Sequence, residues 1–247
     1  MPAPIRFLPL AGLLFAFAAH AAARAAGTPP EYCIEPVEQD AGWAVPWWRE
    51  RHEQKREQAV QSDVDLLMLG DSITQGWEGE GADAWQAYYA RRNAFNLGFG
   101  GDRTEHVLWR LQHGAVDGME PRLVVLLIGT NNTAHRMDPV DCVAGGVRLI
   151  VGELRGRLPA AKILVLGIFP HHESPYNDMR RRNEAINERL ATLADNESVF
   201  FLDIGDVFLR EDGELRRDLM PDLLHPNAAG YEAWAAAMEP VLAKLFE

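Results

Sequence analysis

Short apolar runs and longer amphipathic stretches alternate along most of the chain. The apolar runs have strand length and predict β-strands at Asp65–Leu69, Ala94–Leu97, Leu123–Ile128, Lys162–Gly167 and Val199–Leu202. The other stretches predict helices at about Ala82–Arg92, Glu105–His113, Pro139–Leu158, Asp178–Asp195 and Asn227–Phe246. Strands that alternate with helices form parallel sheets covered on both faces. We therefore expect an α/β fold, a three-layer α/β/α sandwich with a five-stranded parallel sheet of flavodoxin-like form.

A further helix is expected in front of the first strand. Pro46 fits the first turn of a helix, where its missing N–H costs no hydrogen bond, and the charged stretch after it runs to about Gln61. We expect an N-terminal arm and helix over residues 27–62, followed by one sandwich domain over residues 63–247.

Three tryptophans, Trp43, Trp47 and Trp48, stand at the junction of the arm and this helix. Amphipathic aromatic side chains most often serve as packing groups, so we expect them to fix the arm to the body of the protein. The alternative is a platform on which a sugar ring stacks.

The first 26 residues have the features of an export signal. Arg6 precedes the apolar stretch Pro9–Ala19, and small-residue triplets such as Ala21–Ala23 follow it. We expect cleavage of residues 1–26, a secreted or periplasmic protein and no stable membrane anchor afterwards. An uncleaved anchor is the alternative.

The composition is that of an ordinary globular protein. Of the 247 residues, 47% are hydrophobic and 24% are charged, which suits one domain with a sizeable core. The formal charge of −12 repels phosphate backbones, so nucleic acid is not an expected partner.

Two cysteines, Cys33 and Cys142, are the only ones in the chain. In an exported protein they could form a disulfide or remain separate thiols, and the sequence leaves both alternatives open. The histidines other than His225 lack metal-ligand spacing and are expected to be surface or packing groups, including His106, His113, His135, His171 and His172.

Four segments place polar residues where chemistry is expected in such a fold, at the carboxyl ends of strands. Ser72 follows the first strand, a glycine-rich loop over residues 98–104 follows the second, and Asn131 follows the third. Asp222 and His225 precede the last helix. A serine there could be a nucleophile and a histidine its base, with a carboxylate to orient the imidazole.

Each segment also has an ordinary structural interpretation. Ser72 could cap a helix, Asn131 could close a turn, and an Asp-x-x-His spacing is common by chance. The glycine-rich loop lacks the spacing of known nucleotide-binding motifs. No single segment therefore identifies a function.

In this order and spacing, the four segments resemble the SGNH/GDSL hydrolase superfamily, which is named for the Ser, Gly, Asn and His of its four blocks. The stretches Asn96–Arg110, Gly129–Asn132 and Asp222–His225 are similar to the branch that contains the platelet-activating-factor acetylhydrolase α subunits and bacterial GDSL esterases. The resemblance implies the SGNH hydrolase form of the α/β/α sandwich.

The resemblance also implies a role for each candidate residue. Ser72 would attack an ester carbonyl, His225 would take and return the proton, and Asp222 would orient the imidazole. The N–H groups of Ser72 and Gly101 and the side-chain amide of Asn131 would form the oxyanion hole. A triad with an oxyanion hole suffices for acyl transfer, so we expect no metal and no cofactor.

The function implied is serine-dependent hydrolysis of short-chain carboxylic esters. We expect an O-acetyl group on a carbohydrate or a similar alcohol as the substrate. The alternatives are a lipid-directed acetylhydrolase or lysophospholipase of the same fold, and a non-catalytic carbohydrate-binding or cell-envelope protein. The α subunits form dimers, so a homodimer is a further expectation, although no residue here specifies such a contact.

Overall fold

Five parallel strands form one sheet in the order β2-β1-β3-β4-β5. They are β1 (Leu66–Gly70), β2 (Ala94–Gly98), β3 (Leu123–Leu127), β4 (Lys162–Leu166) and β5 (Val199–Leu202). The computed structural model describes residues 31–246, so the expected export segment lies outside the described residues. In this strand order the chain winds in opposite directions from β1, and sheets of this kind bind ligands outside the carboxyl ends of the strands at that switch point, here β1 and β3. The predicted fold class is confirmed.

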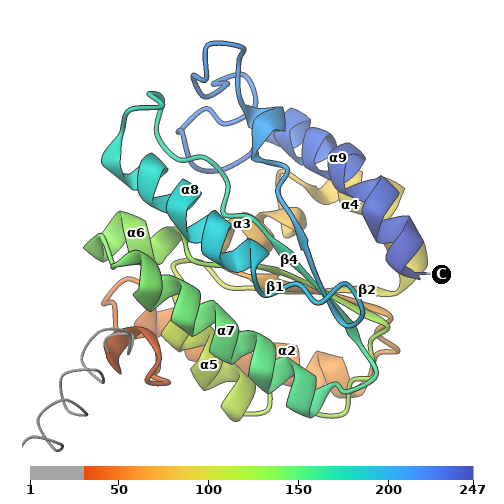
Figure 1. Ribbon diagram of the computed structural model, residues 1–247. Coiled ribbons are helices and arrows are strands. Elements are labelled where there is room, and N and C mark those ends of the chain that lie inside the picture. The colour runs from red at the N-terminus through yellow and green to blue at the C-terminus, as the bar shows by residue number, and fades with distance from the viewer. Residues whose placement is uncertain (1–30, 247) are drawn as a thin grey trace, which may run out of the picture.

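Helices cover both faces of the sheet (Figure 1). One face carries α2 (Val45–Val60), α5 (Thr104–Gln112), α7 (Val140–Arg157) and α8 (Asp178–Ala191). The other face carries α4 (Ala82–Tyr88) and α9 (Ala228–Phe246). Two short helices, α3 (Ser72–Gln75) and α6 (Thr130–Arg136), begin at the carboxyl ends of β1 and β3. None of the helices within residues 31–246 is both long and apolar enough to cross a membrane.

The alternation of side chains along β1 builds two separate cores. Leu67 and Leu69 face α2, α5, α7 and α8, whereas Leu66 and Met68 face α4 and α9. All four side chains are almost completely buried. Burial on both faces is why the strand is a continuous apolar run with no polar alternation.

The observed elements differ from the predicted ones in three places. Helix α6 was not predicted, because Thr130–Arg136 carries no apolar stripe. The stretch predicted as Ala82–Arg92 ends its α-helix at Tyr88 and continues as the 3-10 turn η3 (Ala90–Arg92). Helix α8 ends before Asp195, whose carboxylate instead accepts three backbone N–H groups of the turn into β5.

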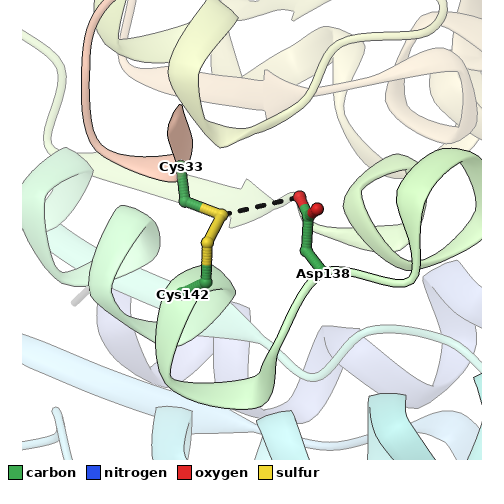
Figure 2. A group of neighbouring side chains, drawn as sticks. All are labelled: Cys33, Asp138 and Cys142. Carbon is green, nitrogen blue, oxygen red and sulfur yellow. Dashed lines mark hydrogen bonds between the residues drawn. A yellow bond between two sulfur atoms is a disulfide. The ribbon is translucent and has the colours of Figure 1, made fainter. Parts of the chain in front are cut away.

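The N-terminal arm is fixed to the body by a disulfide between Cys33 and Cys142 (Figure 2). The two Cα atoms are 5.5 Å apart, which settles the choice between a disulfide and separate thiols. Behind the arm, Trp48 is fully buried and Trp47 is half-buried against the core. Trp43 lies against Gly101 with the edge of its ring but stays 56% exposed, so it packs far less than the other two.

Candidate active site

Ser72 lies at the carboxyl end of β1, at the first position of α3. Asp71 caps this helix, since its Oδ1 accepts the N–H of Ile73 at 3.0 Å. The turn requires Gly70, because a Cβ atom there would lie 2.3 Å from the carbonyl oxygen of Leu127. The N–H of Ser72, at the first position of α3, has no acceptor within the helix and can bind a negative charge.

His225 and Asp222 reach Ser72 from the loop before α9. Nε2 of His225 lies 2.9 Å from Oγ of Ser72, and Nδ1 of His225 lies 2.7 Å from Oδ2 of Asp222. These distances allow proton transfer from the serine to the imidazole, with the carboxylate holding the ring. The structure thus brings together three residues that are up to 153 positions apart in the sequence.

The carboxylate of Asp222 is held by backbone hydrogen bonds in addition to its bond with the imidazole of His225. Its Oδ1 accepts the backbone N–H groups of His225 at 2.7 Å and Leu224 at 3.0 Å. Partial burial would raise the pKa of Asp222, but these bonds and the bond from the imidazole hold it below its ordinary value. An ionised Asp222 stabilises the imidazolium that forms when His225 accepts a proton.

The expected oxyanion donors follow the carboxyl ends of three adjacent strands, β1, β2 and β3. Gly101 follows β2 with φ +76°, a left-handed conformation that favours glycine. The N–H of Gly101 meets no acceptor among residues 31–246, whereas the N–H of Gly100 is already bound to Oε1 of Gln75 at 2.7 Å. Asn131, the second residue of α6, is buried and donates one amide hydrogen to the carbonyl of Asp102 at 2.9 Å. Its other amide hydrogen has no acceptor among the described residues.

Asp102 supports this loop in a way that the sequence did not indicate. Its buried carboxylate accepts Nε1 of Trp48 at 2.6 Å and Nε of Arg110 at 2.8 Å. Burial raises the pKa of Asp102 to about 6, although Arg110 and Trp48 oppose the rise. The guanidinium also lies over the ring of Phe99, 4.0 Å from its centroid. No sequence motif links an arm tryptophan to this aspartate.

The arm contacts the loop at a second point. Nε2 of Gln39 donates to the carbonyl of Gly101 at 3.1 Å and lies 3.2 Å from Nδ1 of His106. Burial, helped by neighbouring arginines, lowers the pKa of His106 to about 2, so this ring is neutral. His106 is therefore a packing group, as predicted.

One cluster of side chains of a kind that can bind metals lies among the described residues, formed by Cys33, Asp138 and Cys142 (Figure 2). The sulfurs are bonded to each other, so they offer no thiolate to a metal. Oδ2 of Asp138 is instead engaged by Arg136 at 2.6 Å and by Nδ2 of Asn132 at 3.0 Å.

Comparison with known proteins finds relatives over most of the chain. The chain is 33% identical to the platelet-activating factor acetylhydrolase IB subunit alpha1 of Homo sapiens over 80% of its own length and 84% of the relative. It is also 33% identical to subunit alpha2 of Rattus norvegicus, over 81% of this chain and 85% of that protein.

Solved structures share the fold at lower identity. A protein of Streptococcus pneumonia assigned as a platelet activating factor has a TM-score of 0.70 at 23% identity, covering 81% of this chain and 94% of its own. An acetylxylan esterase from Geobacillus stearothermophilus has a TM-score of 0.59 at 20% identity, covering 74% and 94%. The model of the GDSL-like lipase/acylhydrolase family matches residues 68–233, which span the serine, both strands beside it and the start of α9. The chain therefore belongs to the GDSL-like lipase/acylhydrolase family.

Proposed function

We propose that this hydrolase cleaves short-chain carboxylic esters with Ser72 as its nucleophile, and that its substrates carry O-acetyl groups on a carbohydrate or a similar alcohol. The observation that carries the proposal is the continuous chain of contacts from Ser72 through His225 to Asp222, with distances of 2.9 and 2.7 Å. A serine paired in this way is activated for attack on a carbonyl carbon.

The reaction proceeds in two halves. Oγ of Ser72 attacks the ester carbonyl while Nε2 of His225 takes its proton, and the tetrahedral oxyanion is held by the N–H groups of Ser72 and Gly101 and the amide of Asn131. His225 then gives the proton to the leaving alkoxide, which departs and leaves an acyl group on Ser72. Water, deprotonated by His225, attacks this acyl-enzyme and releases the acid and the free serine.

The preference for acetyl groups is supported by the names of two kinds of relative, an acetylhydrolase and an acetylxylan esterase. Their leaving groups differ, so a lipid acetyl ester is the second candidate, favoured by the 33% identity to the acetylhydrolase subunits. The side chains of Asp222 and His225 are 56% and 41% exposed. A triad this open leaves room for a bulky polar alcohol as the leaving group.

We also propose that the protein acts outside the cytoplasm. The disulfide between Cys33 and Cys142 supports this, because such bonds persist in oxidising compartments.

The test of the enzymatic proposal is hydrolysis of p-nitrophenyl esters from acetate to palmitate, with Ser72→Ala as the control. We expect fast hydrolysis of acetate, a sharp fall beyond butyrate and no turnover by Ser72→Ala. Good rates on long acyl chains would favour a lysophospholipase, whereas a lipid acetyl ester as substrate would also give the fall beyond butyrate. Turnover that persists in Ser72→Ala would refute the serine mechanism.

A further inference from the structure

The three tryptophans of the arm and α2 have separate roles. Trp48 is fully buried and bound to Asp102, and Trp47 is half-buried against the core. Trp43 is neither buried in the core nor bound to Asp102. It is 56% exposed, and its ring centroid lies 6.2 Å from that of Trp47. An indole that contributes so little to the core has much of its apolar surface open to a ligand.

The exposed ring lies directly beside the proposed oxyanion hole. A Cβ atom at Gly101 would lie 2.2 Å from Cη2 of Trp43, so the edge of the indole contacts the glycine backbone itself. The nitrogen of Gly101 is bonded, at about 1.5 Å, to the Cα atom beside which the indole lies, and a bound oxyanion would lie about 3 Å from that nitrogen. A group attached to the reacting carbonyl therefore passes within reach of the indole.

The segment that carries Trp43 is held in place. Gln39 is bound to the carbonyl of Gly101 at 3.1 Å, and its Oε1 accepts the N–H of Ala41 at 3.2 Å. Upstream, the disulfide fixes Cys33, and Oγ1 of Thr104 donates to the Cys33 carbonyl at 3.0 Å. The indole is thus presented on a fixed segment, which lowers the entropy that a ligand must remove on binding.

We propose that Trp43 is a specificity-determining residue on whose open face the pyranose ring of an acetylated sugar stacks while Ser72 attacks the acetyl ester. The inference rests on the function proposed above and names the part of the site that selects the alcohol. The sugar ring offers a flat C–H face to the indole, and its hydroxyl groups remain in water.

The geometry favours a sugar over the other ligands that bind tryptophan. Quaternary ammonium groups are recognised by cages of several aromatic faces, whereas Trp43 has only Trp47 as an aromatic neighbour among the described residues, tilted by 36°. A long acyl chain is bound in a closed apolar groove, whereas Trp43 is open to solvent.

The test compares two acetyl esters that differ only in the alcohol. Acetylated xylobiose has a ring that can stack, and ethyl acetate, followed by pH-stat titration, has a leaving group too small to do so. We expect Trp43→Ala to lower the ratio of kcat/KM on acetylated xylobiose to kcat/KM on ethyl acetate about tenfold compared with the wild type. The change should come mainly from a higher KM for acetylated xylobiose. Trp43→Phe should recover part of the loss. Tyr32→Ala removes another exposed aromatic of the arm, one that lies over Arg136, and should leave the ratio unchanged.

A binding measurement separates stacking from catalysis. Titration calorimetry of acetylated xylobiose into Ser72→Ala should detect binding that the double variant Ser72→Ala/Trp43→Ala loses. An unchanged kinetic ratio in Trp43→Ala, or a selective loss on a choline-containing acetyl lipid, would overturn the stacking proposal. The proposal would also fail if the wild-type enzyme hydrolysed ethyl acetate but neither hydrolysed nor bound acetylated xylobiose. Failure of the proposed function has a different result, which is no Ser72-dependent hydrolysis of either ester.

Discussion

The indole of Trp48 donates to the carboxylate of Asp102 across 2.6 Å, and this bond joins the N-terminal helix to the residue that follows Gly101. Asp102 also receives Asn131 on its carbonyl, at 2.9 Å. Asp102 thus connects the two proposed oxyanion donors, Gly101 through the chain and Asn131 through a hydrogen bond, to the buried Trp48 of α2. Donors that are held before the substrate arrives stabilise the transition state without reorganising.

We therefore expect Trp48→Phe to lower kcat, because the hydrogen bond to Asp102 is lost, while a large ring still fills the buried position. The change keeps a large ring but removes the donor, and we expect kcat to fall between about tenfold and a hundredfold because the oxyanion donors lose their alignment. The free energy of unfolding should fall by about 1–3 kcal/mol. Steady-state kinetics on p-nitrophenyl acetate and urea unfolding measure the two effects.

The chain offers a matched control in Trp234. This tryptophan is also buried, but it lies in the core on the other face of the sheet, and its Nε1 has no partner among the described residues. Trp234→Phe should lower stability through packing while kcat stays close to that of the wild type. Equal kinetic losses in both variants would contradict a positioning role for Trp48.

Asp222→Asn tests how the imidazole is oriented. The amide oxygen can still accept the N–H groups of Leu224 and His225, so the loop should keep its shape. The NH₂ group would then face Nδ1 of His225, which forces the ring proton onto Nε2 and prevents it from accepting the proton of Ser72. We expect kcat to fall by about three to four orders of magnitude, with little change in the urea midpoint.

Asp218→Asn is the control for this loss of charge. Asp218 lies in the same loop, is exposed, and pairs with Arg216 at 2.8 Å away from the triad. Its substitution should leave kcat unaltered. An active Asp222→Asn enzyme would mean that His225 needs no carboxylate partner.

The sequence predicted the strands because β1 and β3 are buried on both faces and are therefore apolar throughout. Ser72, Asp222 and His225 could be proposed from their places after strands and before the last helix, together with the family resemblance. Helix α6 could not, since its burial comes from polar residues such as Asn132 and Thr133 that bond to other segments rather than from an apolar stripe.

Other features depend on distances that a sequence does not contain. The pairing of Cys33 with Cys142 requires two Cα atoms within bridging distance across 109 residues. Trp43 and Trp48 are the same residue type five positions apart, yet one is exposed and the other fully buried. Trp48 binds Asp102, whereas Trp43 lies at the edge of Gly101. Both partners follow β1 and β2 in the sequence, so the residues around the two tryptophans do not tell which one is buried.

Asp71 predicts how stability depends on pH. Burial, reinforced by the nearby charge of Asp102, raises the pKa of Asp71 to about 7, whereas an unfolded aspartate has a pKa of about 3.9. Between these values the folded chain keeps a proton that the unfolded chain has lost. The contribution of Asp71 to stability is therefore present below about pH 4 and is lost as the pH rises through about 7.

We expect Asp71→Asn to remove this part of the pH dependence. Its amide oxygen can still cap α3 at Ile73, so the variant should gain stability relative to the wild type as the pH rises from 5 to 8. Urea unfolding at the two pH values measures the difference. Asp63→Asn, an exposed site just before β1, controls for the loss of one charge and should keep the slope of the wild type.

The disulfide predicts a loss of stability on reduction. A bridge that spans 109 residues restricts the unfolded chain, and the chain-entropy estimate for such a loop is about 4–5 kcal/mol. We expect dithiothreitol to lower the free energy of unfolding by up to about that amount, and the double variant Cys33→Ala/Cys142→Ala to match the reduced protein and ignore the reductant. Activity should fall together with stability, because the segment after Cys33 contains Gln39, which binds the carbonyl of Gly101, and Trp48, which binds Asp102. A reduced enzyme with unchanged unfolding would show that these contacts alone hold the arm in place.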